Sequence, residues 1–353
     1  MKILIPVVGV FGKAGGWRVL SKLASDWIDE GHEVNFLVYE QTLEPYFPTK
    51  ANILYYDLNG NIRTKNNPAA TSPFLGPLKL RSVLIKILNT LTADVVLANH
   101  CFSAYPVKKS KIEAKKFYYI QAYEPDYYYK KDLKTRIFKR ISKKSYKLGL
   151  NMIVNAPMYL NYREIKTDMF VFPGLDMQNY RPSIEKTNKS AFIIGTIGRT
   201  EEYKGTKYII EAFKILREKL GEKIELHVAF GDPHLEMEEG IKILKPDGDE
   251  NLAKFYQSLD TYVCAGTVQL QAVHYPVIEA MACKIPVITT GYLPSSSLNA
   301  WIVPIKNSIE IANKVIEIMN EDSKQKVEKA YEDVKIFEWK NVSSKMITYF
   351  NRI

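Results

Sequence analysis

Apolar and amphipathic stretches alternate along most of the chain. Short apolar runs indicate buried strands, whereas apolar side chains that recur every three or four positions indicate helices. Strands that alternate with helices are typical of βαβ units, so the pattern predicts an α/β fold built on parallel sheets. The expected strands are Met1–Val10, Glu33–Tyr39, Val95–Ala98, Phe117–Gln121, Met152–Asn155, Met169–Phe172, Ala191–Gly198, Ile224–Phe230, Thr261–Cys264 and Ile285–Thr289. The expected helices include Trp17–Glu30, Thr206–Leu220, Asn251–Leu259, Val277–Ala282 and Glu338–Phe350.

This pattern begins twice, near residue 1 and again near residue 191. Between the two, Pro173–Ser190 is polar and contains Pro173, Gly174 and Pro182, which is the composition of a linker. The 353 residues also correspond to two domains of ~150 residues each. We therefore expect two similar α/β domains, over residues 1–175 and 190–337.

The first apolar run, MKILIPVVGVFG, has two interpretations. It is similar to a short signal peptide, but it leads into a glycine-rich turn and an amphipathic helix without a cleavage site, which favours a buried strand. The cysteines Cys101, Cys264 and Cys283 form no CxxC pair, so we expect packing residues in a reducing compartment rather than a disulfide framework or a zinc site. No segment has the ~18 apolar residues of a membrane-spanning helix. These features predict a cytoplasmic protein.

The net charge of +10 indicates an acidic partner, which could be nucleic acid, an anionic membrane or a phosphorylated substrate. Residues 130–147 hold nine Lys or Arg and one acid, and Leu133, Ile137 and Ile141 recur at helical spacing. A basic amphipathic helix is typical of a membrane-surface element, and we expect peripheral membrane contact here. The alternative is a solvated helix that packs Leu133 and Ile137 on its own domain.

Three segments could bind a nucleotide. The first is a turn with Gly15 and Gly16, where glycines let the backbone approach a ligand and a helix N-terminus offers N–H groups to a phosphate. Its spacing is neither G-x-G-x-x-G nor a Walker A loop, and a flexible turn without a ligand is the alternative.

The second segment, residues 194–205, places Arg199 after a strand and Lys204 before a helix, bracketed by Gly198 and Gly205. Ligands of open parallel sheets bind at the carboxyl ends of the strands, and a guanidinium together with an ammonium suits a diphosphate. Two solvated cations are the alternative.

The third segment, residues 271–290, places Glu279 among small apolar residues, where a carboxylate needs partners. The vicinal hydroxyls of a ribose would be suitable partners, and a helix-capping carboxylate is the alternative. His274 could contact a sugar or be structural. Asp247 and Asp249 resemble a metal-binding DxD motif but lie in a Pro-Asp-Gly sequence that is first of all a turn. Tyr127–Tyr129 could line an acceptor groove or simply pack.

Taken together, these segments resemble the retaining glycosyltransferases of the GT-B fold that form the fourth sequence family, also called group 1. The resemblance covers nearly the whole chain, with the segments in the family's order. The stretches IQAYEP and HYPVIEAMAC are also similar to bacterial rhamnosyltransferases of cell-surface polysaccharide assembly. The segments that carry the family resemblance are GGWRVLSKLASDWIDEGHEV, FVFPGLDMQNYRP, GRTEEYKG, FYQSLDTYV, VIEAMACKIPVITT and FEWKNVSSKMITYF.

The resemblance implies two Rossmann-like doubly wound domains that face each other across a cleft, with the helix at 338–353 packed back on the first domain. It implies sugar transfer from a nucleotide-diphosphate donor to a glycan or lipid-linked acceptor, with retention, without a metal or another cofactor, and with no nucleic acid as partner. Arg199 and Lys204 would bind the diphosphate, and Glu279 would hold the ribose. Gly15 and Gly16 match the loop that faces the donor phosphates, and the loop residues Gln271, His274 and Tyr275 would complete the donor site.

Two positions depart from the family pattern. Gln271 stands where the first glutamate of the Glu-x7-Glu motif belongs, which leaves a lower rate or a different sugar open. Gln121 falls near the place of a histidine that the family often has, with Tyr123 and Glu124 beyond it, and His100 is the nearest histidine. Gln121 and Glu124 are therefore candidate catalytic residues beside Arg199 and Lys204, and which group approaches the reacting carbon stays open.

Two other function classes compete. Glu40 ends the second strand, where a nicotinamide-dependent oxidoreductase has a ribose-binding acid, but the glycine spacing is wrong and the second half of the chain has no role in that interpretation. A binding module without activity would account for Gln271 and the basic helix, although no RNA-stacking motif or helix-turn-helix is visible.

Overall fold

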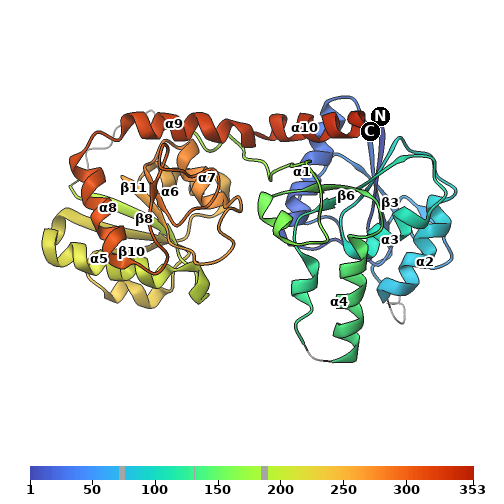
Figure 1. The fold of residues 1–353 in the computed structure, drawn as a ribbon, viewed down its shortest axis with the longest axis horizontal. Helices are drawn as coiled ribbons and strands as arrows, with labels where there is room; N and C mark the ends of the chain where they lie inside the picture. The colour runs from blue at the N-terminus through green and yellow to red at the C-terminus, as the bar shows by residue number, and fades with distance from the viewer. Residues whose placement is uncertain (71–75, 131, 184–189) are drawn as a thin grey trace. The chain divides into compact units, whose positions relative to one another are not determined.

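The computed structural model describes residues 1–70, 76–130, 132–183 and 190–353 (Figure 1). Lys131 of the basic segment and residues 184–189 of the expected linker lie outside the described residues. The chain divides into two compact units, which we describe one at a time. Unit 1 comprises Met1–Pro173 and Trp339–Ile353, and unit 2 comprises Gly174–Glu338.

In the described part of unit 1, seven strands form one sheet in the order β4-β3-β2-β1-β5-β6-β7. The first strand lies in the middle of this sheet, because β1 pairs in parallel with β2 on one side and with β5 on the other. β4 pairs with β3 in antiparallel orientation. The strands are β1 Lys2–Pro6, β2 Glu33–Tyr39, β3 Asn52–Tyr56, β4 Ile62–Arg63, β5 Val95–Ala98, β6 Lys115–Ile120 and β7 Asn151–Val154.

Both faces of the unit 1 sheet are covered by helices. Successive side chains of a strand point to opposite faces, so Ile3 and Ile5 join one core cluster and Leu4 joins the other. This two-sided burial explains why β1 is a continuous apolar run instead of an alternating one. The helices are α1 Gly15–Asp29, α2 Gly76–Leu88, α3 Cys101–Lys109, α4 Leu133–Ser145 and α10 Trp339–Arg352, with short 3₁₀ turns η1 Glu124–Tyr127 and η2 Pro157–Asn161.

The last helix, α10, packs beside α1 in this unit. The ring of Phe350 lies edge-on to Trp27 at a centroid distance of 5.6 Å, and it also contacts Phe117 of β6 at 4.9 Å. Lys115 Nζ donates a hydrogen bond of 3.0 Å to the carbonyl of Phe350. The C-terminal segment is thus part of the core of unit 1.

Within the described residues of unit 2, six parallel strands form a sheet in the order β10-β9-β8-β11-β12-β13. They are β8 Phe192–Ile197, β9 Ile224–Ala229, β10 Ile241–Leu244, β11 Thr261–Cys264, β12 Val287–Thr289 and β13 Trp301–Ile302. The helices are α5 Thr206–Leu220, α6 Gly248–Gln257, α7 Tyr275–Ala282, α8 Ser308–Asn320 and α9 Lys324–Val334, with 3₁₀ turns η3 Glu202–Lys204, η4 Gly221–Lys223, η5 Pro233–Met237 and η6 Lys335–Phe337.

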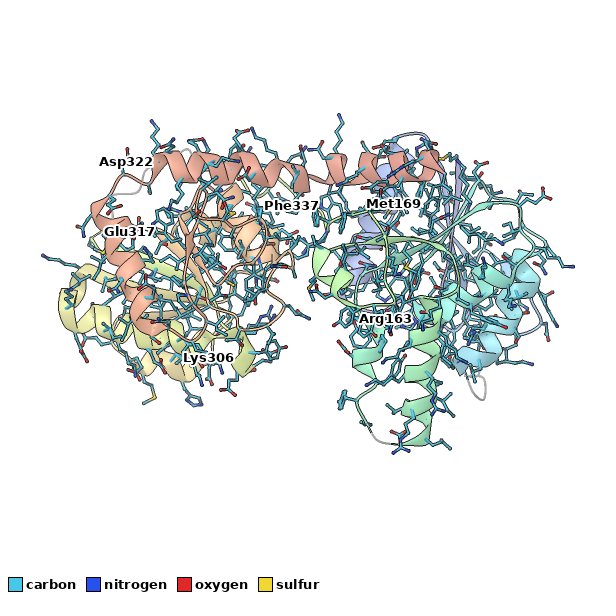
Figure 2. All side chains as sticks on the ribbon, in the orientation of Figure 1. Arg163, Met169, Lys306, Glu317, Asp322 and Phe337 are labelled. Atoms are coloured by element: carbon cyan, nitrogen blue, oxygen red, sulfur yellow. The ribbon has the colours of Figure 1, made fainter. Side chains whose placement is uncertain are left out.

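The prediction of a strand at Met169–Phe172 is wrong. Phe170 forms only an isolated bridge with Val154, at the edge of the sheet. The side chain of Met169, which is labelled in Figure 2, is 7% exposed and belongs to the core of unit 1. Pro173 follows at once and has no N–H to extend the ladder. Among the helices of the described residues, none is both long and apolar enough to cross a bilayer.

Candidate functional site

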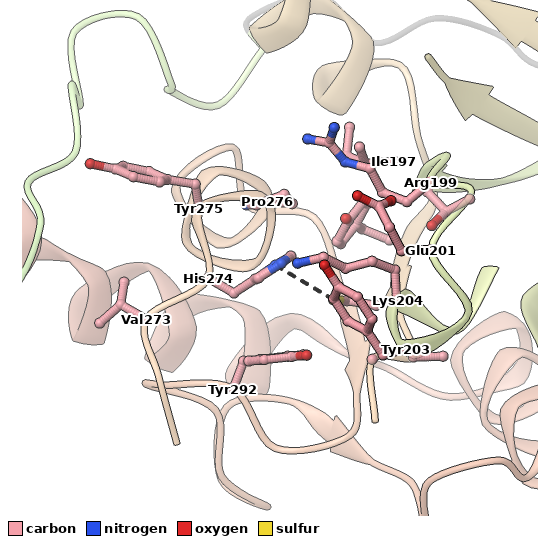
Figure 3. A pocket seen from close by; sticks show the side chains of 15 residues that line it. Ile197, Arg199, Glu201, Tyr203, Lys204, Val273, His274, Tyr275, Pro276 and Tyr292 are labelled. Atoms are coloured by element: carbon pink, nitrogen blue, oxygen red, sulfur yellow. Dashed lines mark hydrogen bonds between the residues drawn. The ribbon is translucent and has the colours of Figure 1, made fainter. Parts of the chain in front are cut away.

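A cavity of about 450 Å³ opens in unit 2 at the carboxyl ends of β8 and β11 and the N-terminus of α7 (Figure 3). Four residues expected at the donor site, Arg199, Lys204, His274 and Tyr275, line this one cavity. The position is where open parallel sheets bind ligands. The other lining residues are Thr196, Ile197, Glu201, Tyr203, Tyr262, Cys264, Ala265, Gly266, Val273, Pro276 and Tyr292.

Two glycines hold the turn that carries the cations. A Cβ on Gly198 would lie 2.4 Å from the Cα of Gly231, so the loops after β8 and β9 meet only because Gly198 lacks a side chain. Gly205 has a φ of +78°, and a Cβ there would lie 1.9 Å from the carbonyl oxygen of Ala265. Backbone contact between loops therefore fixes the turn, and other residue types at these positions would displace it.

Thr206 closes the same turn. The backbone N–H of Arg199 donates to Thr206 Oγ1 at 3.2 Å, and that hydroxyl donates to the carbonyl oxygen of Arg199 at 3.0 Å. Arg199 and Lys204 thus start from the two ends of a short, closed loop. Within the described ranges neither side chain forms an ion pair, so the cavity holds two cations whose charge is available to an anion.

The field of these cations acts on His274. Burial, then Lys204 and then Arg199 lower the pKa of His274 to about 4. The imidazole is therefore neutral near pH 7 and adds a hydrogen-bonding group, not a third charge. A phosphate bound here would meet two cations, a neutral ring and the N-terminal end of α7.

Glu279 does not line the cavity. It lies in the second turn of α7, which has no acid in its first turn, so the alternative of a capping carboxylate is wrong. The side chain is 4% exposed and accepts a hydrogen bond of 2.9 Å from the hydroxyl of Tyr256. Tyr262, which does line the cavity, lies edge-on to Tyr256 with ring centroids 5.4 Å apart. Burial, then Cys264 and then Glu279 raise the pKa of Tyr262.

Gln271 also stays outside the lining. Its backbone has a φ of +70°, its side chain is exposed, and its N–H donates to the carbonyl of Gly291 at 3.1 Å. The loop enters the cavity only from Val273 onward. Gln271 thus lies outside the cavity lining, and its expected role in the donor site stays a prediction.

A second cavity, of about 370 Å³, lies in unit 1. Gln121 and Glu124 line it, and Gln121 Nε2 donates to the carbonyl oxygen of Gly16 at 3.3 Å. Gly15 begins α1 but is not part of the lining. Further lining residues are Val7, Val8, Ala14, Gly16, Trp17, Leu20, Asn99, His100, Ala122 and Tyr127.

Glu124 is held by the protein itself. Its carboxylate accepts from the backbone N–H of Cys101 at 2.9 Å and from the Tyr118 hydroxyl at 2.8 Å. Burial raises the pKa of Glu124, against the smaller opposing effects of His100 and these hydrogen bonds. The carboxyl thus anchors the start of α3 and thereby the position of His100, which precedes it. Tyr123 does not belong to the lining of the unit 1 cavity. Its ring stacks on Tyr162 with the centroids 3.5 Å apart.

The sequence interpretation gave less weight to two lining residues, Asn99 and His100. Both follow directly after β5, at the carboxyl edge of the sheet, and that position is the signal that could have selected them. Asn99 donates through Nδ2 to the carbonyl of Pro6 at 3.1 Å. His100 Nδ1 accepts from the backbone N–H of Phe102 at 3.3 Å and caps α3.

His100, Cys101 and Glu124 have potential metal-ligand atoms within 4.8 Å of one another. The donor set does not suit a metal, because the Glu124 oxygens already accept two hydrogen bonds and His100 Nδ1 accepts another. Burial also raises the pKa of the Cys101 thiol well above its usual value, which disfavours the thiolate that a metal requires. Asp249, of the Asp-Gly-Asp turn, accepts from the hydroxyl of Tyr180 at 3.2 Å.

The basic helix α4 extends from the rest of unit 1 (Figure 1) and buries few of its side chains. Phe138 packs edge-on against Phe102 at 5.2 Å, and Ser142 and Ser145 are buried. Leu133 is 74% exposed and Ile137 is 41% exposed. The alternative in which these residues pack on their own domain is therefore wrong for Leu133, whereas Ile137 is partly covered by its own domain.

Glu40 belongs to the lining of neither cavity. Its carboxylate is largely buried, 3.9 Å from the guanidinium of Arg63. A ribose-binding acid of a dinucleotide site has to be available to the ligand. The burial of Glu40 therefore weakens the support that this residue gave to an oxidoreductase.

Comparison with known proteins agrees with the geometry. Residues 191–321 match the sequence model of a family described as "Glycosyl transferases group 1". That range contains both cations and the whole of the unit 2 cavity. The match confirms the prediction of a glycosyltransferase. No curated protein matches the chain.

Solved structures with the same fold cover nearly the whole chain. The sucrose-phosphate synthase of Thermosynechococcus elongatus is 14% identical, with a TM-score of 0.70 over 99% of this chain and 98% of the other. Anabaena HepE in complex with UDP and glucose is 15% identical, with a TM-score of 0.66 and complete coverage of both chains. TarM of S. aureus is 14% identical, with a TM-score of 0.67 and 99% coverage of both. These similarities confirm the GT-B fold that the sequence predicts.

Proposed function

We propose that the protein transfers a sugar from a nucleoside diphosphate sugar whose diphosphate is bound by Arg199 and Lys204. The single observation that supports this most is the pair of cations without an acidic partner among the described residues, in one cavity at the carboxyl ends of β8 and β11. In a low-dielectric cavity two such charges stabilise the charge that grows on a departing diphosphate.

The reaction we propose breaks the bond between the anomeric carbon and the β-phosphate oxygen, and the electron pair leaves with the diphosphate. The oxygen of an acceptor hydroxyl forms the new bond to that carbon, and its proton passes to an oxygen of the departing diphosphate. Arg199 and Lys204 supply the positive charge at the leaving group, so the transfer requires no metal ion. We further propose that the anomeric configuration is retained, on the basis of the resemblance to retaining enzymes. Glu279 is proposed to reach the ribose hydroxyls once Tyr262 adjusts to a bound nucleotide.

UDP is the first nucleotide to test. Anabaena HepE is described in complexes with UDP and UDP-glucose, and a TarM variant of S. aureus in a complex with UDP. The similarity of IQAYEP and HYPVIEAMAC to rhamnosyltransferases adds a nucleoside diphosphate rhamnose to the donors worth testing.

We propose a glycan or lipid-linked acceptor of cell-surface polysaccharide synthesis, which the protein meets at the inner face of the membrane. WaaB, a lipopolysaccharide outer core galactosyltransferase, shares the fold with a TM-score of 0.70 at 12% identity over the full length of both chains. The basic helix supports a membrane location: α4 exposes Leu133 and Ile137 between cationic side chains, so it can insert apolar groups while Lys and Arg meet anionic headgroups. Salt should weaken this binding.

The test is a screen of nucleotide sugars by release of the nucleoside diphosphate, with Lys204→Ala as the diagnostic variant. We expect hydrolysis or transfer with at least one donor. Loss of a charged hydrogen bond worth about 1.5–3 kcal/mol should lower kcat/KM by roughly 10- to 150-fold in the variant. The matched control is Lys207→Ala, because Lys207 is exposed, paired with Glu202 and absent from the 450 Å³ cavity lining. Equal activity of wild type and Lys204→Ala would contradict the proposal.

A further inference from the structure

Cys264 lies at the carboxyl end of β11, and its sulfur is 3.6 Å from Nδ1 of His274. The dashed line that starts at the imidazole in Figure 3 marks this contact. The sequence interpretation treated this cysteine as a packing residue. Both residues line the cavity with Arg199 and Lys204. The contact therefore belongs to the site proposed for the diphosphate.

The chemistry of the two groups favours one direction for this hydrogen bond. Burial raises the pKa of Cys264 to about 12, so the group is a thiol. A thiol is both a weak donor and a weak acceptor, whereas the unprotonated nitrogen of a neutral imidazole is a good acceptor, so we assign the S–H as the donor and Nδ1 as the acceptor. Nδ1 then carries the lone pair, and the single ring proton of a neutral histidine must be on Nε2.

A tyrosine also stacks on the face of the His274 ring. Tyr292 stacks on His274 with centroids 4.6 Å apart and an angle of 27° between the planes. The Tyr292 hydroxyl donates to the carbonyl of Val268 at 2.9 Å, which fixes the tyrosine. His274 precedes the first residue of α7, yet its side chain accepts no capping hydrogen bond. The ring is thus oriented by a thiol and a tyrosine, not by the helix.

We propose that Cys264 is a positioning residue, which holds His274 in the tautomer whose Nε2–H donates a hydrogen bond to a phosphate oxygen between Arg199 and Lys204. This inference rests on the proposed function, because it names a further contact of the same donor site. The neutral N–H of His274 would orient the phosphate through a directed hydrogen bond, whereas Arg199 and Lys204 attract it by their charge. The opposite tautomer would present a lone pair to the phosphate and repel it.

Two pairs of variants separate tautomer control from packing. Cys264→Ala removes the donor, whereas Cys264→Ser keeps an O–H in its place. His274→Gln keeps an N–H at about the distance of Nε2, whereas His274→Asn places its amide near the position of Nδ1. Cys283→Ala is the matched control, because Cys283 is an equally buried cysteine of unit 2 that does not line the cavity.

The tautomer is read by long-range ¹H–¹⁵N NMR of the unliganded protein, in which the chain's 5 histidines give few signals and His274→Gln assigns the relevant one. We expect a protonated Nε2 and an unprotonated Nδ1 for His274 in wild type. Cys264→Ala should give a mixture of tautomers, and Cys264→Ser should restore the wild-type pattern at least in part.

Affinity for UDP and for inorganic pyrophosphate is measured by calorimetry on the same variants. A hydrogen bond to a charged group is worth about 1.5–3 kcal/mol, so His274→Asn should weaken UDP binding by roughly 10- to 150-fold, Cys264→Ala by less, and His274→Gln least. Cys283→Ala should bind as wild type does.

An unchanged tautomer and an unchanged UDP affinity in Cys264→Ala would overturn the inference and leave the proposed function standing. A wild-type protein that binds neither UDP nor pyrophosphate would overturn the proposed function and the phosphate contact with it. The NMR signal would in that case still decide whether Cys264 sets the tautomer of His274.

Discussion

The exposed apolar residues of α4 allow a quantitative test of membrane contact. We consider the double variant Leu133→Ser/Ile137→Ser. Full burial of a leucine or isoleucine side chain is worth about 1.5–3 kcal/mol. With 74% of Leu133 and 41% of Ile137 exposed, insertion of both into a bilayer gains about 2–3 kcal/mol. The variant should therefore bind vesicles roughly 30- to 140-fold more weakly than wild type.

The assay is co-sedimentation with vesicles of an anionic phospholipid in phosphatidylcholine, at low and at physiological salt. Leu133 is largely solvated and Ile137 is partly covered, so the thermal midpoint of the variant should fall only slightly below that of wild type. The matched control is Ile309→Ser, which removes a 65% exposed isoleucine from α8 of unit 2 and should leave vesicle binding unchanged.

Equal vesicle binding by wild type and the double variant would refute the insertion of α4. Binding to neutral vesicles as strong as to anionic ones would refute the role of its basic residues, each of which should contribute ~1 kcal/mol near an anionic surface.

Two further predictions concern folding. Gly198→Ala should lower the thermal midpoint and the UDP affinity together, because its Cβ would collide with the backbone of Gly231. In Gly76→Ala the added Cβ has no atom of the described residues within 4 Å, so this variant should be neutral or slightly stabilising. Equal midpoints of the two variants would contradict this. Because burial raises the pKa of Glu124 above its usual 4.5, the folded state keeps a proton that the unfolded state has lost, so stability falls as pH rises above that value. Urea unfolding at pH 4 and pH 8 should show Glu124→Gln gaining on wild type at the higher pH, and a pH-independent difference would contradict the assignment.

Much of the fold follows from hydrophobic periodicity. Thr206–Leu220 and Thr261–Cys264 were predicted to the residue, because glycines bracket the helix and all four residues of the strand are buried. β10 was not predicted, since it is a short edge strand with a lysine inside. α3 was missed as well, because Pro106 lies within it and its spacing is weak. Short edge elements depend on partners far away in the sequence, which local patterns do not encode.

The site could be predicted only in part. Arg199, Lys204, His274 and Tyr275 meet in one cavity because each follows a strand at the same edge of a sheet. Gln271 lies outside this cavity. The spacing of amino acids along the chain does not show that its backbone adopts a left-handed conformation. The contact between Cys264 and His274 was also missed, since the two belong to separate elements.

The most direct measurement for the central claim is a crystal structure of the protein with UDP. We predict a diphosphate in the unit 2 cavity, with its oxygens within hydrogen-bonding distance of the Arg199 guanidinium and the Lys204 ammonium. A nucleotide bound elsewhere, with both cations still facing solvent, would contradict the account.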